Sequence, residues 1–185
     1  HNTLSKCGSS QWVLDADIRS CFDEIGHEAI LQRMPAFTKT IRCWLKAGVM
    51  HGLNYLDVEM GTPQGGVISP LLANIALDGM ERLFGSERPD GKHITPTERR
   101  GPNKGISLIR YADDFIVTAP SPEVIKQHVI PTLTKFLSER GLALNKTKTR
   151  ITHIKYGFSF LGFDVKKRDG KILITPSKKA VIKHR

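Results

Sequence analysis

The stretch IRYADDFIVT, residues 109–118, constrains the fold most strongly, because it places two adjacent aspartates between two short apolar runs. Apolar and β-branched runs on either side of a short polar segment predict two strands joined by a tight turn, with Asp113 and Asp114 at the tip of the hairpin. Adjacent carboxylates repel each other, which raises the pKa of at least one of them unless a cation neutralises both. The alternative interpretation is a solvated turn, since aspartate is a common turn residue.

A second strand is predicted near the amino terminus, where QWVLDADI over residues 11–18 alternates apolar and polar side chains. One face of this strand is apolar, and the other carries Asp15 and Asp17. If the strand lies beside the hairpin tip in one sheet, Asp17, Asp113 and Asp114 converge. Carboxylate oxygens with no His or Cys nearby suit Mg²⁺. Two such ions about 4 Å apart can hold the attacking and leaving oxygens of a phosphoryl transfer.

Helix and strand signals alternate along the rest of the chain and predict an α+β fold. The order of strand, helices, hairpin, helix and strands is typical of an antiparallel sheet with helices packed on one face. Residues 58–70 are typical of a glycine-rich loop that ends in a helix N-cap at Ser69, and residues 85–105 of a basic surface loop or insertion. Pro131 is expected to kink or split its helix. The predicted helices run from about Gly26 to before Pro35, over 37–49, from Ser69 onward and over 121–140, and the last short strands join at Asp169-Gly170.

The composition indicates a globular protein that is attracted to polyanions. The chain has 185 residues, with 28 Lys and Arg against 18 Asp and Glu, and its net charge of +10 favours nucleic-acid partners. No apolar run approaches the roughly 20 residues of a membrane helix, and there is no signal peptide. The three cysteines have neither pairing nor zinc spacing and indicate free thiols in a reducing compartment. We therefore expect a cytoplasmic or organellar protein that is not secreted, and the missing initiator Met indicates a fragment or a trimmed chain.

Five segments, from about Trp12 to Phe163, resemble the successive palm motifs of reverse transcriptases in their order along the chain. The segment TPQGGVISPLLANI, together with Tyr-Ala-Asp-Asp, is most similar to group II intron-encoded reverse transcriptases, also called maturases. Each motif alone is only moderately specific, but five in the right order are very specific. The segments are VLDADIRSCFDEI, GTPQGGVISPLLANIALDGME, IRYADDFIV, GLALNKTKT and FSFLGF.

The resemblance implies an RNA-directed DNA polymerase that joins deoxynucleotides to a primer 3′-OH. Two Mg²⁺ ions are implied as cofactors, with Mn²⁺ as a possible substitute. The implied partners are an RNA template (the intron RNA), a DNA primer and deoxynucleoside triphosphates, and no membrane. A maturase role in splicing of the intron RNA is expected of the full-length protein.

The metal ligands implied by the resemblance come from two motifs. Asp17 matches the first metal ligand, and Asp113 and Asp114 supply the others. Ile18 would offer its backbone carbonyl to a metal. Asp15, on the same strand, is expected to be a structural carboxylate near the site and not a ligand.

Nucleotide-binding residues are also implied. Phe22 matches the aromatic residue that floors the sugar pocket, where its ring would exclude a 2′-hydroxyl; without the resemblance, Phe22 would be a core residue, and it can be both. Gln64 matches a residue that contacts the incoming nucleotide. Gly65 and the glycine after it would let the backbone approach the sugar and base closely, because glycine lacks a Cβ atom. A flexible turn before a helix is the alternative for this loop.

Two further sites are implied near the carboxyl end. Lys148 matches a lysine that can protonate or stabilise the leaving pyrophosphate as a general acid, although it is also one of many basic residues. The primer grip, which holds the primer 3′ end, is matched by Phe160, Leu161 and Gly162. An apolar strand is the alternative interpretation of the same residues.

The resemblance implies that residues 1–185 are a partial palm domain, with most of the fingers and all of the thumb missing. The basic segments 85–105 and 177–185 could touch RNA phosphates or be solvated loops. Two alternatives to a polymerase of the group II intron type stay open. One is an RNA-binding splicing cofactor without polymerase activity, and the other is a reverse transcriptase of phage defence or of a CRISPR system.

Overall fold

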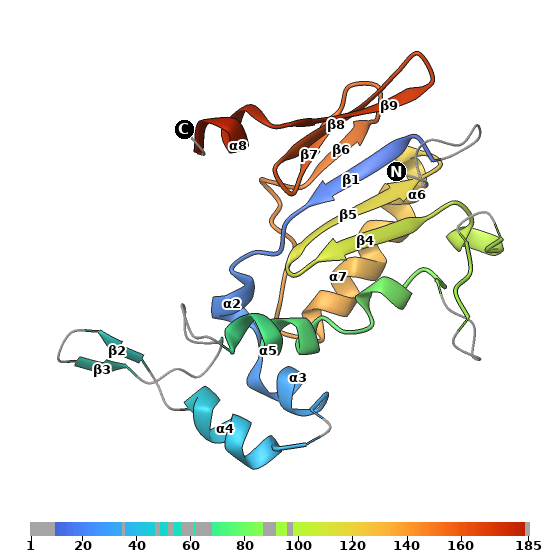
Figure 1. The fold of residues 1–185 in the computed structure, drawn as a ribbon. Helices are drawn as coiled ribbons and strands as arrows, with labels where there is room; N and C mark the ends of the chain where they lie inside the picture. The colour runs from blue at the N-terminus through green and yellow to red at the C-terminus, as the bar shows by residue number, and fades with distance from the viewer. Residues whose placement is uncertain are drawn as a thin grey trace.

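The fold is organised around a four-stranded antiparallel sheet, shown in Figure 1. The strand order is β4-β5-β1-β6, so the strand nearest the amino terminus lies in the middle of the sheet, between strands from the second half of the chain. The strands are β1 (Trp12–Ala16), β4 (Ser107–Tyr111), β5 (Asp114–Ala119) and β6 (Arg150–His153). The structure is a computed structural model that describes residues 10–34, 36–46, 49–51, 54–56, 61, 68–86, 92–95 and 98–183.

Both faces of the central strands are covered. Leu14 of β1 packs into the main hydrophobic core under the helices. Val13 and Ile116, on the opposite face, pack with Ile154 and Phe158 in a second cluster. The predicted α+β fold with helices against the sheet is therefore confirmed, and a smaller sheet covers part of the other face. Burial on both sides explains why Phe115, Ile116 and Val117 of β5 are all apolar rather than alternating with polar residues.

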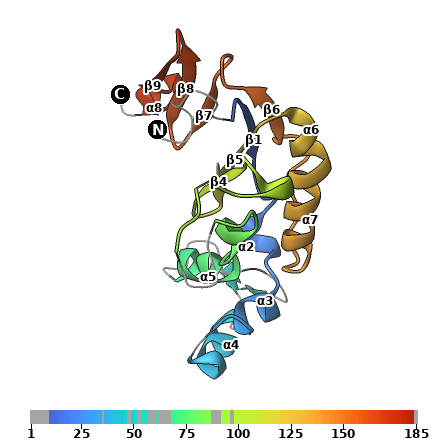
Figure 2. The ribbon, with the colours of Figure 1, turned by 90° about the vertical axis from the view of Figure 1, so that its right-hand side faces the viewer.

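The helical segment behind the sheet is irregular where the sequence predicts a kink. It consists of α6 (Pro122–Val124), a π-helical turn η3 (Ile125–Val129) and α7 (Ile130–Ser138), and it runs along one face of the sheet (Figure 2). Pro131 lies in the first turn of α7, directly after the π-helical turn. Ser121 caps the segment, because its side-chain oxygen accepts a backbone N–H of the first turn at 3.3 Å.

One predicted helix is shorter than expected. The helix predicted over 37–49 is α4 (Thr38–Lys46), and the prediction is wrong at its end. Val49–His51 forms strand β2 instead, which pairs antiparallel with β3 (Asn54–Leu56). The backbone groups of β2 are thus satisfied by a neighbouring strand rather than by a helical turn.

The N-cap prediction for Ser69 is also wrong, by one residue. Ile68 occupies the N-cap position of α5 (Ser69–Ala76), and its carbonyl accepts a hydrogen bond from Leu72 N–H at 3.1 Å. Ser69 is buried within the helix. Among the described residues, no helix is both long and apolar enough to cross a membrane. The other helices of this half are α2 (Cys21–Glu24), α3 (His27–Leu31) and the 3-10 turn η1 (Met80–Arg82).

A three-stranded antiparallel sheet follows the main sheet in the chain and ends in a short helix. The turn predicted at Asp169-Gly170 is confirmed, since both residues have the positive φ angles (48° and 77°) of a tight hairpin turn. The elements are β7 (Phe158–Phe160), β8 (Phe163–Arg168), β9 (Lys171–Pro176) and α8 (Lys178–Lys183).

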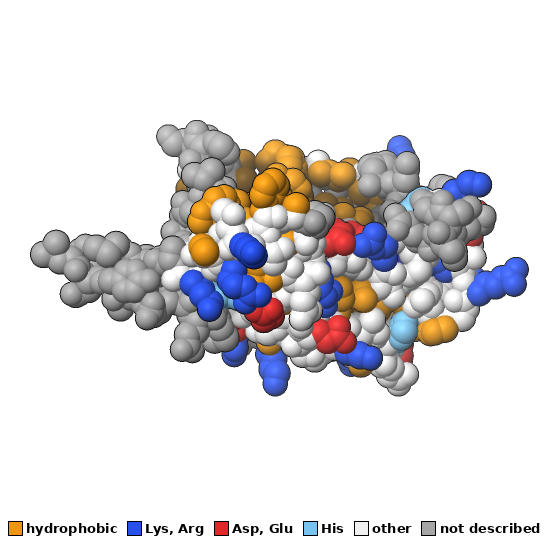
Figure 3. Space-filling view, turned by 90° about the horizontal axis from the view of Figure 1, so that it is seen from below, with side chains coloured by type: hydrophobic (Ala, Val, Ile, Leu, Met, Phe, Trp, Pro, Cys, Tyr) orange, Lys and Arg blue, Asp and Glu red, His pale blue; other side chains and the backbone are white. Residues whose placement is uncertain are grey.

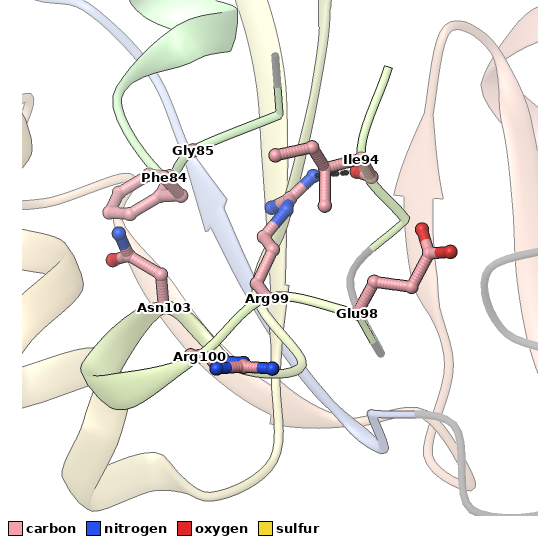
Figure 4. Close-up of a pocket in the computed structure, with 7 residues that line it drawn as sticks. All are labelled: Phe84, Gly85, Ile94, Glu98, Arg99, Arg100 and Asn103. Atoms are coloured by element: carbon pink, nitrogen blue, oxygen red, sulfur yellow. Dashed lines mark hydrogen bonds between the residues drawn. The ribbon is translucent and has the colours of Figure 1, made fainter. Parts of the chain in front are cut away.

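The described part of the basic segment 85–105 is packed against the start of β4. Arg99 is buried, with its guanidinium donating hydrogen bonds to the carbonyls of Ile106 and Ile94. A cavity of about 400 Å³ lies here, lined by Arg99 and Arg100 among others (Figure 4). One arginine of this segment is therefore structural, because it holds the loop to the sheet, and does not belong to a solvated surface.

Candidate active site

Asp17 and the Asp113-Asp114 tip lie at the same end of the four-stranded sheet. The antiparallel pairing of β1 with β5 ends with Ala16 opposite Phe115. One step further, the same register sets Asp17 beside Asp114. Tyr111 pairs with Asp114 across the β4–β5 hairpin, which puts Asp113 in a two-residue turn. Strand pairing therefore brings together the three carboxylates that the sequence places far apart.

Arg110 holds this turn in place, and the sequence reasoning missed it. Its guanidinium, 10% exposed, lies 2.7 Å from Glu81 Oε1. Its Nη1 donates to Asn74 Oδ1 at 2.9 Å and to the Ala112 carbonyl at 2.8 Å. Ala112 has a left-handed φ of 54°, which is unfavourable for a residue with a Cβ atom and needs support from its surroundings. The available signal was an arginine inside an apolar strand, three residues before the aspartate pair.

Lys148 reaches the same end of the sheet from the loop before β6. Its Nζ donates to Asp17 Oδ2 at 2.8 Å. Asn145 positions this loop, because its backbone N–H donates to the Asp17 carbonyl at 2.8 Å while its Oδ1 accepts from Lys148 N–H at 3.3 Å. The LNKTK segment thus connects a basic side chain to the first of the three carboxylates.

The charges at this end of the sheet interact strongly. Burial raises the pKa of Asp114, and the neighbouring charges of Asp113 and Asp17 raise it further, against the opposing effect of Lys148. The hydrogen bond to Asp17 raises the pKa of Lys148. Burial raises the pKa of the Cys21 thiol to about 12, with a further contribution from Asp113. Repulsion among the carboxylates is therefore only partly balanced by one lysine, and the thiol is protonated at neutral pH.

The donor chemistry of this cluster suits a hard divalent cation. Its groups are carboxylate oxygens, which Mg²⁺ prefers, and the protonated Cys21 thiol is not a ligand. As the side chains lie, however, no three His, Cys, Asp or Glu residues in the described part of the chain form a group that could hold a metal ion. Asp17 Oδ2 is bound to Lys148, so this oxygen must be released before it can bind another cation.

Ile18 forms an isolated antiparallel bridge with Leu144 just beyond β1. The hydrogen bonds that frame the bridge are Arg19 N–H to Ala143 O and Asn145 N–H to Asp17 O, at 2.9 and 2.8 Å. The pairing therefore does not engage the Ile18 carbonyl. The Ile18 side chain is buried in the main core, which fixes the backbone at this point.

Phe22 is half-buried on α2, whereas its neighbour Cys21 is buried in the main core. The beginning of the glycine-rich loop lies against its backbone. A Cβ atom at Gly61 would lie 2.7 Å from the Phe22 carbonyl oxygen and 2.5 Å from that of Asp23. Gly61 also donates its N–H to the Ile25 carbonyl at 2.8 Å and has a φ of 82°, so only glycine fits here. Gln64 and Gly65 lie outside the described residues.

The segment predicted as primer grip forms the turn between β7 and β8. Phe160 is partly buried against the second cluster, whereas Leu161 is exposed. Leu161 and Gly162 have φ angles of 50° and 80°, and the Gly162 carbonyl accepts a hydrogen bond from Ser177 N–H at 2.8 Å. The turn is therefore fixed to the start of α8 and belongs to the small sheet, not to the sheet that carries the aspartates.

The sequence of this chain is similar to that of known reverse transcriptases and related proteins. The reverse transcriptase (RNA-dependent DNA polymerase) family matches residues 1–165. The group II intron-encoded protein LtrA of Lactococcus lactis subsp. cremoris is 28% identical over 227 residues, which cover 89% of this chain and 38% of LtrA. Protein YkfC of Escherichia coli (strain K12) is 31% identical over 187 residues, which cover 86% of this chain and 48% of YkfC.

A solved structure shows the same fold at low sequence identity. Telomerase from Candida albicans, in a complex with a fragment of telomeric RNA, superposes with a TM-score of 0.59 at 16% identity, over 95% of this chain and 33% of the telomerase chain. The chain spans less than half the length of each of these three proteins. The chain belongs to the reverse transcriptase (RNA-dependent DNA polymerase) family.

Proposed function

We propose that this chain is the palm of an RNA-directed DNA polymerase that adds deoxynucleotides to a primer 3′-OH on an RNA template. The observation that carries the proposal is the β1–β5 register, which sets Asp17 next to Asp114 at the end of the sheet. Membership in the reverse transcriptase family supports the same reaction. Because the chain spans 38% of LtrA and 48% of YkfC, we propose that it supplies the palm of a longer protein.

Asp17, Asp113 and Asp114 would hold the Mg²⁺ ions, with the Ile18 carbonyl as a further oxygen donor and with Mn²⁺ as a substitute. The ions would supply electrostatic stabilisation of the triphosphate and of the attacking oxygen. Burial is the main cause of the raised pKa of Asp114, and the nearby charges of Asp113 and Asp17 add to it. These nearby charges support the role, since a carboxylate beside two others binds a cation favourably.

The remaining residues would position the substrates. Phe22 on α2 would lie beneath the sugar of the incoming deoxynucleotide, and Gln64 and Gly65 would contact the same nucleotide. Lys148, which is protonated at neutral pH like any exposed lysine, would donate a proton to the leaving pyrophosphate once its hydrogen bond to Asp17 is released. Phe160, Leu161 and Gly162 would hold the primer end.

We further propose that the full-length protein has a maturase role and binds its intron RNA, in a bacterial cytoplasm or an organelle matrix. The similarity to a group II intron-encoded protein supports this role over one in phage defence. An RNA-binding splicing cofactor without polymerase activity is the alternative against which we test the proposal.

Primer extension on an RNA template separates the two candidates. In a polymerase that contains this segment, Asp113→Asn is expected to lower deoxynucleotide incorporation by roughly 10³-fold, the scale of removing one preorganised electrostatic group at a reacting centre. RNA affinity should stay unchanged, because it depends mainly on Lys and Arg contacts to phosphate. Asp78→Asn, which removes an exposed carboxylate in the turn after α5, is the matched control.

Equal incorporation by the Asp113→Asn and Asp78→Asn variants would reject the polymerase and favour the splicing cofactor. Parallel loss of incorporation and RNA affinity in Asp113→Asn would mean that the aspartate is structural.

A further inference from the structure

The net positive charge of this chain comes entirely from its last forty residues. Residues 1–145 contain sixteen Lys and Arg against sixteen Asp and Glu, so they have no net charge. Residues 146–185 contain twelve Lys and Arg against two Asp, and therefore carry the whole net charge of +10. The small sheet and α8 lie in this segment, which also contains β6.

The register of the small sheet sorts these cations onto one face. Val165 of β8 and Ile172 of β9 pack toward the main sheet in the second cluster. Lys166, Arg168 and Lys171 alternate with them and are exposed on the opposite face, which points away from the four-stranded sheet.

The arrangement of these cations lowers the stability of the chain when nothing is bound to it. Arg168 pairs directly with Lys171 across the two strands. Like charges at opposite positions of a strand pair are destabilising. The one ion pair here joins Arg168 to Asp169 at 3.7 Å, at an exposed tip, and neither Lys166 nor Lys171 has an ion pair among the described residues. Asp164 lies on the same face of β8 but accepts a hydrogen bond from Ser159, so Asp169 is the one carboxylate on this face that forms an ion pair among the described residues.

A cavity lies next to this face, beside the β7–β8 turn. It has a volume of about 560 Å³ and lies between Ser159, Asp164 and the start of α8, where Lys178 and Lys179 line it. Both lysines are exposed and form no ion pair in the described structure. We call Lys166, Arg168, Lys171, Lys178 and Lys179 the outer cationic face.

The opposite end of the molecule has a different charge pattern. Figure 3 shows acidic and basic side chains close together on the face seen from below, where α3 and α4 lie. Arg42 of α4 pairs there with Glu28 of α3 at 2.7 Å. Residues 27–46 contain four Lys and Arg against one Glu, so this end is also positive, with fewer cations than residues 146–185.

We propose that the outer cationic face binds the sugar-phosphate backbone of RNA outside the copying site. Charge complementarity selects a polyanion, and the choice of RNA rests on the proposed function. Exposed lysines and arginines bind phosphates by releasing counterions, without reading sequence. Leu173 and Thr175 lie on the same face of β9, where an apolar and a hydroxyl side chain can contact the sugars.

Fluorescence anisotropy of a labelled, unstructured single-stranded RNA tests the proposal, with the 185-residue chain in EDTA so that no metal contributes. The face variant combines Lys166→Gln, Arg168→Gln and Lys171→Gln. The control variant combines Lys39→Gln, Lys126→Gln and Lys135→Gln, three exposed lysines on α4 and the helical segment behind the main sheet. Both variants lose three positive charges, so only the location of the charges differs.

At low salt we expect the face variant to bind RNA roughly 10- to 100-fold more weakly, with a slope of log K against log salt that is shallower by about 2. The control variant should stay close to the unchanged chain. Equal weakening of both variants, or unchanged binding by the face variant, would overturn the proposal. Circular dichroism checks that the hairpin is folded, and Lys178→Gln with Lys179→Gln on α8 provides a second variant that leaves the strands intact.

This experiment is independent of the catalytic proposal. Loss of RNA binding by the face variant does not depend on the aspartates, and Asp113→Asn in EDTA should bind RNA like the unchanged chain. If the face variant binds RNA normally while Asp113→Asn loses incorporation, the RNA-binding proposal fails and the catalytic one stands. If the face variant loses RNA binding while Asp113→Asn keeps incorporation, the catalytic proposal fails and the RNA-binding one stands.

Discussion

The aspartate end of the four-stranded sheet and the outer face of the small sheet both concentrate charge, but they hold it differently. At the aspartate end, the Arg110 side chain is 10% exposed and bound to three groups. Strand β5, which begins at Asp114, and strand β1, which ends just before Asp17, each pair with a strand on both sides. The small sheet has few buried residues, and Leu161, Phe163, Leu173 and Ile174 are 43–49% exposed.

The difference separates a site that requires geometry from a surface that requires only charge. Chemistry on a phosphoryl group needs atoms held within fractions of an ångström, which a paired sheet and a buried arginine provide. Contacts to a flexible phosphate backbone tolerate loose side chains, because the attraction is long-ranged and without sequence readout. Four pairs of variants test this contrast, each with one change at the aspartate end and one on the small sheet.

The largest difference is expected for catalysis. Asp17→Asn should lower deoxynucleotide incorporation by roughly 10³-fold, since it removes one charge from the reacting centre. Asp164→Asn on β8 should leave incorporation unchanged. Primer extension with a saturating template measures both, and equal rates would show that Asp17 has no part in the reaction.

The second-largest difference is expected for the free energy of unfolding. Arg110→Ala is expected to lower the free energy of unfolding by about 2–3 kcal/mol, because it leaves Glu81 and the Ala112 carbonyl without their partner. Arg168→Ala, at a side chain that is 74% exposed, should change it by less than about 0.5 kcal/mol. Urea unfolding followed by circular dichroism compares the two, and similar losses would contradict the positioning role of Arg110.

Substrate selectivity gives a smaller effect. Phe22→Ala should raise the ratio of ribonucleotide to deoxynucleotide incorporation by roughly tenfold or more, since steric exclusion of one small group is worth about this factor. Because Phe22 is half-buried, the fold should survive the truncation. Phe163→Ala on the small sheet should leave the ratio unchanged. An unaltered ratio in a folded Phe22→Ala variant would remove Phe22 from the sugar pocket.

The smallest expected effect concerns pH. Because the pKa of Asp114 is raised in the fold, the folded chain binds this proton more tightly than the unfolded chain. Stability therefore falls as the pH rises from the ordinary carboxyl value through the raised one. In EDTA, Asp114→Asn should raise the melting temperature slightly at neutral pH, and the gain should vanish at acid pH, where the carboxyl group is protonated.

Asp169→Asn provides the control on the small sheet, since Asp169 is 92% exposed and asparagine tolerates its positive φ angle. It should not reproduce this pH-dependent gain. A gain for Asp114→Asn that persists at acid pH would show that ionisation of the Asp114 carboxyl group is not its cause.

Local signals were sufficient for much of the fold. The hairpin at Asp113-Asp114, the cap at Ser121, the irregularity before Pro131 and the turn at Asp169-Gly170 each depend on a few neighbouring residues, which propensity and turn chemistry can predict. The end of α4 was mispredicted, because the residues after it form strand β2, which pairs with β3. The N-cap of α5 was mispredicted by one residue, because Ile68 occupies this position instead of Ser69.

The sequence by itself determined the residue types of the candidate site and the family, because the motifs keep their order and each one carries its own turn or strand signal. Only the tertiary structure decided that Asp17 lies beside Asp114, that Arg110 supports the turn and that the cations of β8 and β9 share one outward face. These facts depend on which strands pair and in which register. Register is set by the packing of both faces of a sheet, which no short segment encodes.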